Sequence, residues 1–331
     1  MRVLWIALVI FTVTCDQYII RTRKNAQHVY SSENIAPNHD YVFGNLFYGF
    51  SAELDAQQAI KLEQNPLVIS VTKSKPLILP IKDFSNEQPN PISNTTEWNL
   101  DQLDGVIDKR YIYEGDGHGV DCYIVDSGIN TNHTQLQGRA IWGANFCTKE
   151  KNIDRDLDGH GTHVAGIVGS KDYGVARNVT LIAVKVSGET GGNQADLLAG
   201  LNWVLKKATT TGRPSLINIS MGLGFDEAIN LAVQALTEAG IAVVAASGNF
   251  FSDACGISPA SSPFVFTVAA SGPKNMFWEK SNHGKCVNVI APGVNIKSLT
   301  AWGRYVGDDW YFPGMSSRRW CCCTGVVHQE V

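Results

Sequence analysis

The sequence lacks an excess of positive charge, a long apolar run and an internal repeat. The formal net charge is −4, so the composition gives no support to nucleic-acid binding. The apolar run near the N-terminus, Val3 to Val13, is shorter than the roughly 20 residues that a membrane-spanning helix needs. No later stretch is apolar enough for an anchor. With 331 residues, 44% of them hydrophobic, the chain suits one large or two smaller globular domains.

The N-terminus has the order of a secretory signal peptide. Met1-Arg2 supplies a positive start, the apolar run follows, and polar residues begin at Asp16. We therefore assign residues 1–15 to a signal peptide and expect the protein to be secreted and extracellular. A buried strand or helix is the alternative interpretation of the same run.

Residues 16–92 are predicted to form a separate small α+β domain. Strand patterns at residues 18–20 and 47–54 precede a helical pattern from Ala56 to Gln64, and a further strand pattern follows at residues 67–71. Residues 83–96 are rich in Asn, Ser, Pro and Asp, which is typical of a linker. The second domain is accordingly assigned to residues 93–331.

From Trp98 onward, short apolar strands alternate with helical patterns, which predicts an α/β fold with a parallel doubly wound sheet and helices on both faces. The expected strands are residues 120–125, 181–186, 215–221 and 241–246, and the expected helices are residues 160–170, 196–209 and 228–239. Ligands of such sheets bind beyond the carboxyl ends of the strands. Asp126, Ser220 and Asn249 fall at or just past such ends.

Asp126 and His160 are the candidate catalytic pair. Asp126 ends a buried strand, and His160 starts the segment Gly-Thr-His-Val-Ala-Gly, whose small residues allow close packing of a helix on a sheet. An Asp that orients a His, which then deprotonates a hydroxyl, is the machinery of acyl transfer. The alternative for Asp126 is a turn cap. His160 and His163 could instead bind a metal, but a hydrolytic zinc helix has its histidines four apart with a Glu, which this segment lacks.

At these residues the chain resembles the subtilisin-like serine proteases, nearest to their proteinase K-like branch. The order Asp then His, with the nucleophile last, is that of subtilisin. The resemblance implies that His160 is the general base, that Asp126 orients it and that Asn249 in Ala-Ala-Ser-Gly-Asn stabilises the oxyanion. It also implies substrate-binding walls formed by Ser220, Met221, Gly222, Leu223, Ser247 and Gly248, with a further edge at residues 187–192. Turn formation is the alternative role for these Gly-rich segments.

The resemblance has further implications for the rest of the chain. Residues 16–92 resemble the propeptide that inhibits such catalytic domains. The resemblance therefore implies two kinds of partner: peptide or protein substrates, and the chain's own propeptide as an intramolecular inhibitor. Cys255 and Cys286 match positions that are disulfide-bonded in secreted members. Cys122 and Cys147 either pair or remain free thiols. No cofactor is required for the chemistry; structural calcium occurs in the family, but no residues are assigned to it here.

The sequence identifies the nucleophile less clearly than it identifies Asp126 and His160. Gly314-Met315-Ser316 makes Ser316 the candidate, yet the apolar helix that the family places after its nucleophile is replaced by a segment with Arg318 and Cys321-Cys322-Cys323. One codon choice for this segment, shifted by one base, encodes a helix of the family type. A frame disruption is therefore an open interpretation, under which the chain as written would have little activity. The sequence predicts a secreted serine endopeptidase; a pseudoprotease that binds peptides or acts through its propeptide is the alternative.

Overall fold

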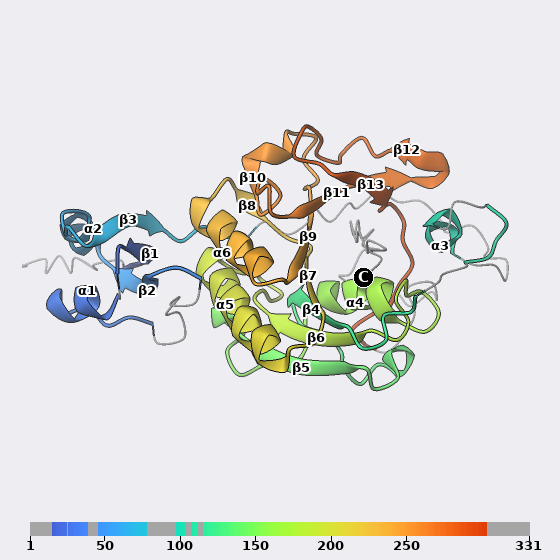
Figure 1. The fold of residues 1–331 in the computed structure, drawn as a ribbon, viewed down its shortest axis with the longest axis horizontal. Helices are drawn as coiled ribbons and strands as arrows, with labels where there is room; N and C mark the ends of the chain where they lie inside the picture. Colours follow the sequence, from blue (N-terminus) through green and yellow to red (C-terminus); the bar gives the residue numbers. More distant parts are fainter. Residues whose placement is uncertain are drawn as a thin grey trace, which may run out of the picture. The chain divides into compact units, whose positions relative to one another are not determined.

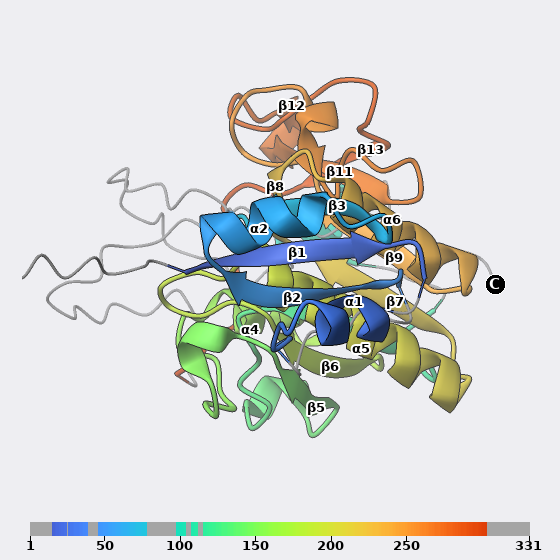
Figure 2. The same ribbon diagram turned by 90° about the vertical axis from the view of Figure 1, so that its left-hand side faces the viewer.

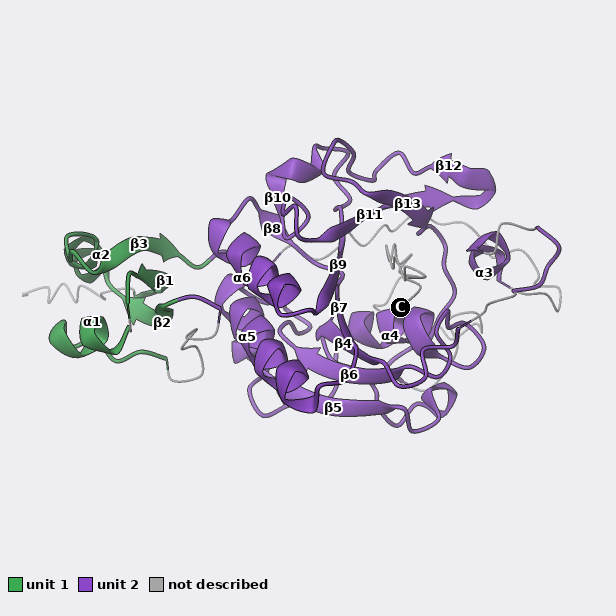
Figure 3. Ribbon diagram, viewed as in Figure 1, with its two compact units in different colours: residues 1–44, 48–74 green, residues 45–47, 75–331 purple. Residues whose placement is uncertain are grey.

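The computed structural model describes residues 15–24, 26–38, 46–77, 97–103, 107–111 and 115–302. The chain divides into two compact units, one made of residues 1–44 and 48–74 and the other of residues 45–47 and 75–331 (Figure 3). Within the described ranges, no helix is long and apolar enough to cross a membrane.

The first unit contains an antiparallel sheet with the strand order β2-β1-β3. Its elements are β1 (Asp16–Thr22), α1 (Gln27–Ser32), β2 (Gly49–Leu54), α2 (Ala56–Glu63) and β3 (Val68–Lys73). Helix α2 begins where the side chain of Asp55 accepts a hydrogen bond from the Gln58 amide and the Gln58 side chain accepts one from the Asp55 amide. The predicted small α+β unit is confirmed. Helix α1 was not predicted, since six residues carry too little periodicity.

The second unit is built on a mostly parallel sheet with the order β12-β11-β9-β7-β4-β6-β5, and β13 pairs with β11 (Figure 1). Its strands are β4 (Asp121–Asp126), β5 (Ala140–Asn145), β6 (Thr180–Lys185), β7 (Ser215–Ile219), β9 (Ala242–Ala246), β11 (Phe266–Gly272), β12 (Met276–Phe277) and β13 (Val289–Pro292). Only β12 runs antiparallel to its neighbour among the described pairs. Two short strands, β8 (Leu223–Gly224) and β10 (Ile257–Ser258), pair apart from this sheet.

Helices cover both faces of this sheet, as the continuous apolar strands predict. Helix α4 (His160–Gly169) lies on one face, and α5 (Gln194–Thr211) and α6 (Glu227–Glu238) lie on the other (Figures 1 and 2). A further helix, α3, spans Trp98–Leu103. The core under α4 joins Val164, Ile167 and Val168 of the helix to Ile124 and Leu181 of the sheet. All six residues of β4 are buried, so a polar residue in this strand needs a partner inside the protein.

Among the described strands of the second unit, the sequence did not predict β5, β8 or β10 to β13. Strand β5 reads Ala-Ile-Trp-Gly-Ala-Asn and is less apolar than its neighbours, with Ile141 exposed. The predicted helix at residues 196–209 begins two residues earlier, because Asn193 accepts a hydrogen bond from the Asp196 amide at 2.9 Å and caps the helix. It ends at Thr211, and Gly212, whose backbone is left-handed, caps it.

The structure also shows which of the described cysteines form a disulfide. Cys255 and Cys286 form a disulfide with a Cα–Cα distance of 5.4 Å, as expected from the resemblance. Cys122 and Cys147 are free and buried. Burial raises the pKa of the Cys122 thiol to about 12, so this group stays protonated and unreactive at neutral pH.

Several predictions concern residues outside the described ranges. These are residues 1–14 of the assigned signal peptide, the boundary between residues 92 and 93, and the candidate nucleophile Ser316 with the segment around it. The first compact unit ends at Ser74, before the predicted boundary.

Candidate active site

The structure joins Asp126 and His160 by a short hydrogen bond. Asp126 is the last residue of β4 and fully buried; His160 is the first residue of α4 and 1% exposed. The imidazole Nδ1 lies 2.7 Å from Oδ1 and 2.9 Å from Oδ2 of the carboxylate. A carboxylate acceptor at Nδ1 selects the tautomer in which Nδ1 carries the proton and Nε2 is the basic nitrogen. The pair can therefore serve as an oriented general base.

Close packing at the start of α4 holds the two residues together. A Cβ at Gly161 would lie 2.1 Å from the carbonyl oxygen of Gly128, so only glycine lets the helix approach the turn after Asp126. Gly128 itself has φ +112°, a conformation that side chains rarely adopt. The small residues at these positions bring the helix start against the strand end.

Asp156 fixes the same region, and the sequence analysis missed it. Its Oδ1 accepts hydrogen bonds from Ser127 Oγ at 2.9 Å and the Gly159 amide at 2.8 Å. Its Oδ2 accepts from the amide and hydroxyl of Thr162 at 2.9 and 2.6 Å. Burial raises the pKa of this carboxyl, while the hydrogen bonds counteract the rise. Asp156 thus ties the turn after Asp126 to the first turn of α4.

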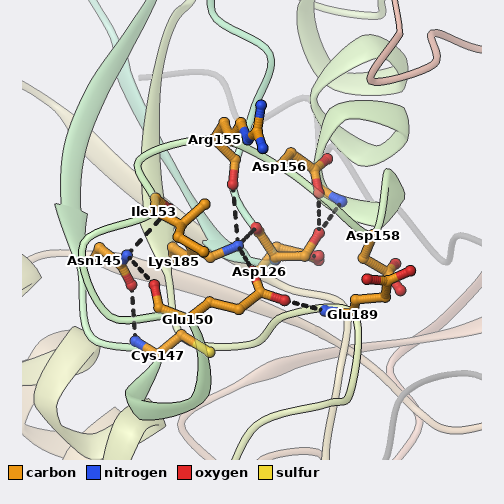
Figure 4. Close-up of polar contacts among 12 residues, drawn as sticks. Asp126, Asn145, Cys147, Glu150, Ile153, Arg155, Asp156, Asp158, Lys185 and Glu189 are labelled. Atoms are coloured by element: carbon orange, nitrogen blue, oxygen red, sulfur yellow. Dashed lines mark hydrogen bonds and ion pairs between the residues drawn. The ribbon is translucent and has the colours of Figure 1, made fainter.

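A buried ion pair lies next to this turn (Figure 4). Lys185, the last residue of β6, is fully buried, and its Nζ lies 2.8 Å from Glu150 Oε2. The same Nζ donates to the carbonyl oxygens of Ser127 at 2.7 Å and Arg155 at 3.1 Å. Glu150 Oε1 accepts from the Glu189 amide at 2.6 Å. The pair therefore connects the turn after Asp126 with the loop before His160 and with the predicted substrate edge.

This ion pair carries a stability prediction. Replacing Lys185 by Met would leave Glu150 buried without its cation, so we expect Lys185→Met to lower the free energy of unfolding by about 3–5 kcal/mol. Adding Glu150→Gln removes the stranded charge and should recover part of the loss. Urea unfolding followed by fluorescence measures both changes.

Arg110→Gln is the matched control, since Arg110 pairs with Asp108 at a side-chain exposure of 72%. Exposed pairs contribute about 0–1 kcal/mol, so its loss should be small. Equal losses for Lys185→Met and Arg110→Gln would contradict the assignment of a buried pair.

His163 lies one turn after His160 and has a structural environment. Its Nε2 lies 3.2 Å from the carbonyl oxygen of Ile296 and the residue is 2% exposed. Within the described residues, no group of three or more His, Cys, Asp or Glu side chains could hold a metal ion. Burial lowers the pKa of His163 to about 3, with the neighbouring His160 as a second cause.

The buried His163 predicts a pH dependence of stability. An unfolded histidine titrates near 6.5, whereas folded His163 stays neutral down to about pH 3. The unfolded chain therefore binds an additional proton between these values, and stability is fully present above pH 6.5 and falls as the pH drops. The slope should be about 1.4 kcal/mol per pH unit. Urea unfolding from pH 8 to pH 4.5 should show this fall in the native chain relative to His163→Gln.

His118→Gln supplies the control, because His118 is exposed. Its stability should run parallel to that of the native chain at every pH. A parallel curve for His163→Gln would show that burial of this imidazole does not govern the acid sensitivity.

Asn249 lies on the same edge of the sheet as Asp126. It follows β9, and β9, β7 and β4 are parallel neighbours whose carboxyl ends share one edge. The residue is 4% exposed, and its side-chain oxygen is buried and accepts no hydrogen bond in the described part of the chain. Gly248 has φ +101°, and a Cβ there would lie 2.6 Å from Asn282 Nδ2. The turn between β9 and Asn249 therefore packs against Asn282, which leaves no space for a side chain at position 248.

The predicted substrate walls follow β7 and β9. Ser220 is buried, and its hydroxyl accepts from Asn218 Nδ2 at 2.8 Å. Met221 and Leu223 are also buried, as is Gly222, which lies between them in the sequence. The carbonyl oxygen of Ser247, which precedes Gly248, accepts from Asn282 Nδ2 at 2.9 Å. These residues lie at strand ends, as the sequence predicts.

The edge at residues 192–194 carries an extended segment. Pro76 pairs with Asn193 in an antiparallel bridge. The Leu77 amide donates to the Gly192 carbonyl at 3.1 Å, and the Gln194 amide donates to the Lys75 carbonyl at 2.7 Å. An extended peptide thus adds to this edge through main-chain hydrogen bonds, a common mode of peptide recognition.

A doubly wound α/β unit with a buried carboxylate–imidazole pair at its strand ends has the framework of a hydrolase that uses a general base. Residues 117–319 match the subtilase family, and residues 17–79 match the peptidase inhibitor I9 family. The chain belongs to the subtilase family and carries an inhibitor-type unit before the subtilase unit.

Individual relatives agree with this membership. The chain is 37% identical to alkaline serine exoprotease A of Vibrio alginolyticus, over 80% of this chain and 49% of the relative. It is 34% identical to cerevisin of Saccharomyces cerevisiae, over 89% of this chain and 46% of the relative. The chain thus spans about half the length of these curated relatives. The crystal structure of a cold-adapted subtilisin-like serine proteinase matches with a TM-score of 0.61 at 37% identity, covering 64% of this chain and 78% of that one.

Proposed function

We propose that the protein is a secreted serine endopeptidase that hydrolyses peptide bonds through Asp126, His160 and Ser316. The observation that carries the proposal is the buried hydrogen bond between His160 Nδ1 and Asp126, at 2.7 Å, in a chain of the subtilase family. The carboxylate orients the imidazole and stabilises the imidazolium that forms during catalysis.

The proposed reaction proceeds through an acyl-enzyme. His160 Nε2 takes the proton of the Ser316 hydroxyl while the serine oxygen attacks the peptide carbonyl. The Asn249 side-chain amide donates a hydrogen bond to the oxyanion, and His160 then protonates the leaving amine. Water, deprotonated by His160, releases the acid and restores Ser316. No cofactor enters these steps; structural calcium remains an expectation from the resemblance, without assigned residues.

The N-terminal unit is proposed to act as an intramolecular inhibitor and to be removed. Its match to the peptidase inhibitor I9 family supports this role. The following residues Lys75, Pro76 and Leu77 occupy the edge at residues 192–194 in the manner of an extended peptide. Substrate peptides would take this edge after processing, with Ser220, Met221, Gly222, Leu223, Ser247 and Gly248 forming the remaining walls.

Hydrolysis of casein and of a fluorogenic peptide by the secreted product tests the proposal. We expect turnover that rises as His160 becomes neutral, that resists a zinc-selective chelator and that requires loss of the N-terminal unit. Absence of turnover after verified removal of this unit would contradict the endopeptidase and favour a peptide-binding protein. Abolition by a zinc chelator would instead support the metal interpretation of His160 and His163.

A further inference from the structure

One side chain of the extended segment enters a polar site that main-chain pairing does not require. Lys75 Nζ donates to Asp226 Oδ2 at 3.1 Å and to the Phe225 carbonyl oxygen at 3.2 Å. The Asp226 side chain is 6% exposed, whereas that of Lys75 is 45% exposed. A fixed, buried carboxylate thus meets a cation that reaches it from the solvent side.

The carboxylate is held in place by residues of the catalytic unit itself. Asp226 Oδ1 accepts from the Ile229 amide at 3.1 Å, which caps α6, and from Gln194 Nε2 at 2.9 Å. The Asp226 amide donates to Ser258 Oγ at 2.9 Å. None of these contacts involves the Lys75 ammonium, so the catalytic unit supplies partners for the carboxylate that do not depend on the basic side chain. Oδ2 is directed to the Lys75 ammonium.

The register of the occupant is also fixed. The Lys75 amide donates to Gln194 Oε1 at 3.2 Å, and the Lys75 carbonyl accepts from the Gln194 amide at 2.7 Å. Two residues later, Leu77 is 7% exposed, and its Cδ1 lies 3.0 Å from where a Cβ of Gly192 would be. Alternate residues of an extended segment face the same side. The catalytic unit therefore contacts the basic side chain at position 75 and the apolar side chain at position 77 at the same time.

We propose that Asp226, the Phe225 carbonyl and Gln194 form a subsite for a lysine or arginine side chain of an extended peptide. In a bound peptide, one residue takes the position of Leu77. The subsite binds the basic side chain two residues before it, at the position of Lys75. It serves the chain's own segment before processing and selects substrates afterwards; this second role rests on the proposed function. Charge-assisted hydrogen bonds to a preorganised carboxylate provide the selectivity.

The first test uses the full chain and requires no activity. Hydrogen exchange at the Leu77 and Gln194 amides reports how firmly residues 75–77 hold to the edge. We expect about tenfold faster exchange in Lys75→Gln, a larger increase in Lys75→Glu and little change in Lys75→Arg. In an Asp226→Asn background, which retains the Oδ1 acceptor for the helix cap, Lys and Gln at position 75 should behave alike. Equal exchange of Lys75→Gln and the native chain would overturn the subsite.

The second test measures substrate selection after processing. Two fluorogenic peptides carry Leu at the place of Leu77 and differ only in Lys or Gln two positions earlier. We expect kcat/KM to be about tenfold higher for the Lys peptide and the preference to disappear in Asp226→Asn. An unchanged preference in Asp226→Asn would overturn the role in substrate selection. If neither peptide is cleaved, the proposed function fails, and the exchange experiment alone decides the subsite.

Discussion

His160→Ala is expected to reduce turnover by about 10⁶-fold, a magnitude that comes from removal of the general base in subtilisin itself. The reason is that the Ser316 hydroxyl is a weak nucleophile at its ordinary pKa and depends on an adjacent base. Steady-state kinetics with a fluorogenic peptide above pH 7, where an unperturbed imidazole is neutral, measures the loss. KM should change little, because the imidazole acts on the reacting proton rather than on the bound peptide chain.

His118→Ala provides the control, since His118 is exposed and belongs to the same unit. Its turnover should equal that of the native chain. Folding of His160→Ala is checked by circular dichroism. A folded His160→Ala with near-native turnover would refute the role given to His160.

Asn249→Ala is expected to lower kcat by about 10²–10³-fold, again a magnitude known from the corresponding donor in subtilisin. The amide donates to an oxyanion that exists only during the reaction, so substrate binding should be nearly unchanged. Kinetic measurement of kcat and KM separates the two effects. Asn178→Ala, at an exposed amide, should leave both parameters unchanged.

A rise in KM with unchanged kcat in Asn249→Ala would show that the residue binds the ground state. In that case Asn249 would line the substrate site instead of stabilising the oxyanion.

The sheet could be predicted where strands are continuous apolar runs. Residues 121–126, 180–185 and 242–246 are such runs, and their alternation with helical patterns indicates parallel pairing. Strand β5 escaped prediction because Trp142 and Gly143 interrupt its pattern and a register shift lies between Trp142 and Ala144. Short edge strands such as β12 carry only two residues and offer no periodicity.

The candidate pair could be predicted because Asp126 and His160 are chemically unusual at their places in the sequence. The supporting groups are harder to find, since their roles depend on which loops meet in space. Lys185 did offer a signal, because a lysine that ends a buried strand must have partners. Glu150 lies 35 positions before Lys185, at the end of a short 3-10 helix (Thr148–Glu150), so only the folded chain shows that it is this partner.

The central claim, that Asp126 and His160 activate Ser316, is tested most directly by labelling with a serine-directed phosphonate. The full chain is expressed, its N-terminal unit is removed, and mass spectrometry locates the label. The account predicts stoichiometric labelling at Ser316, which is lost in His160→Ala and in Ser316→Ala. Absence of a label in the processed native chain, or a label on another residue, would contradict it.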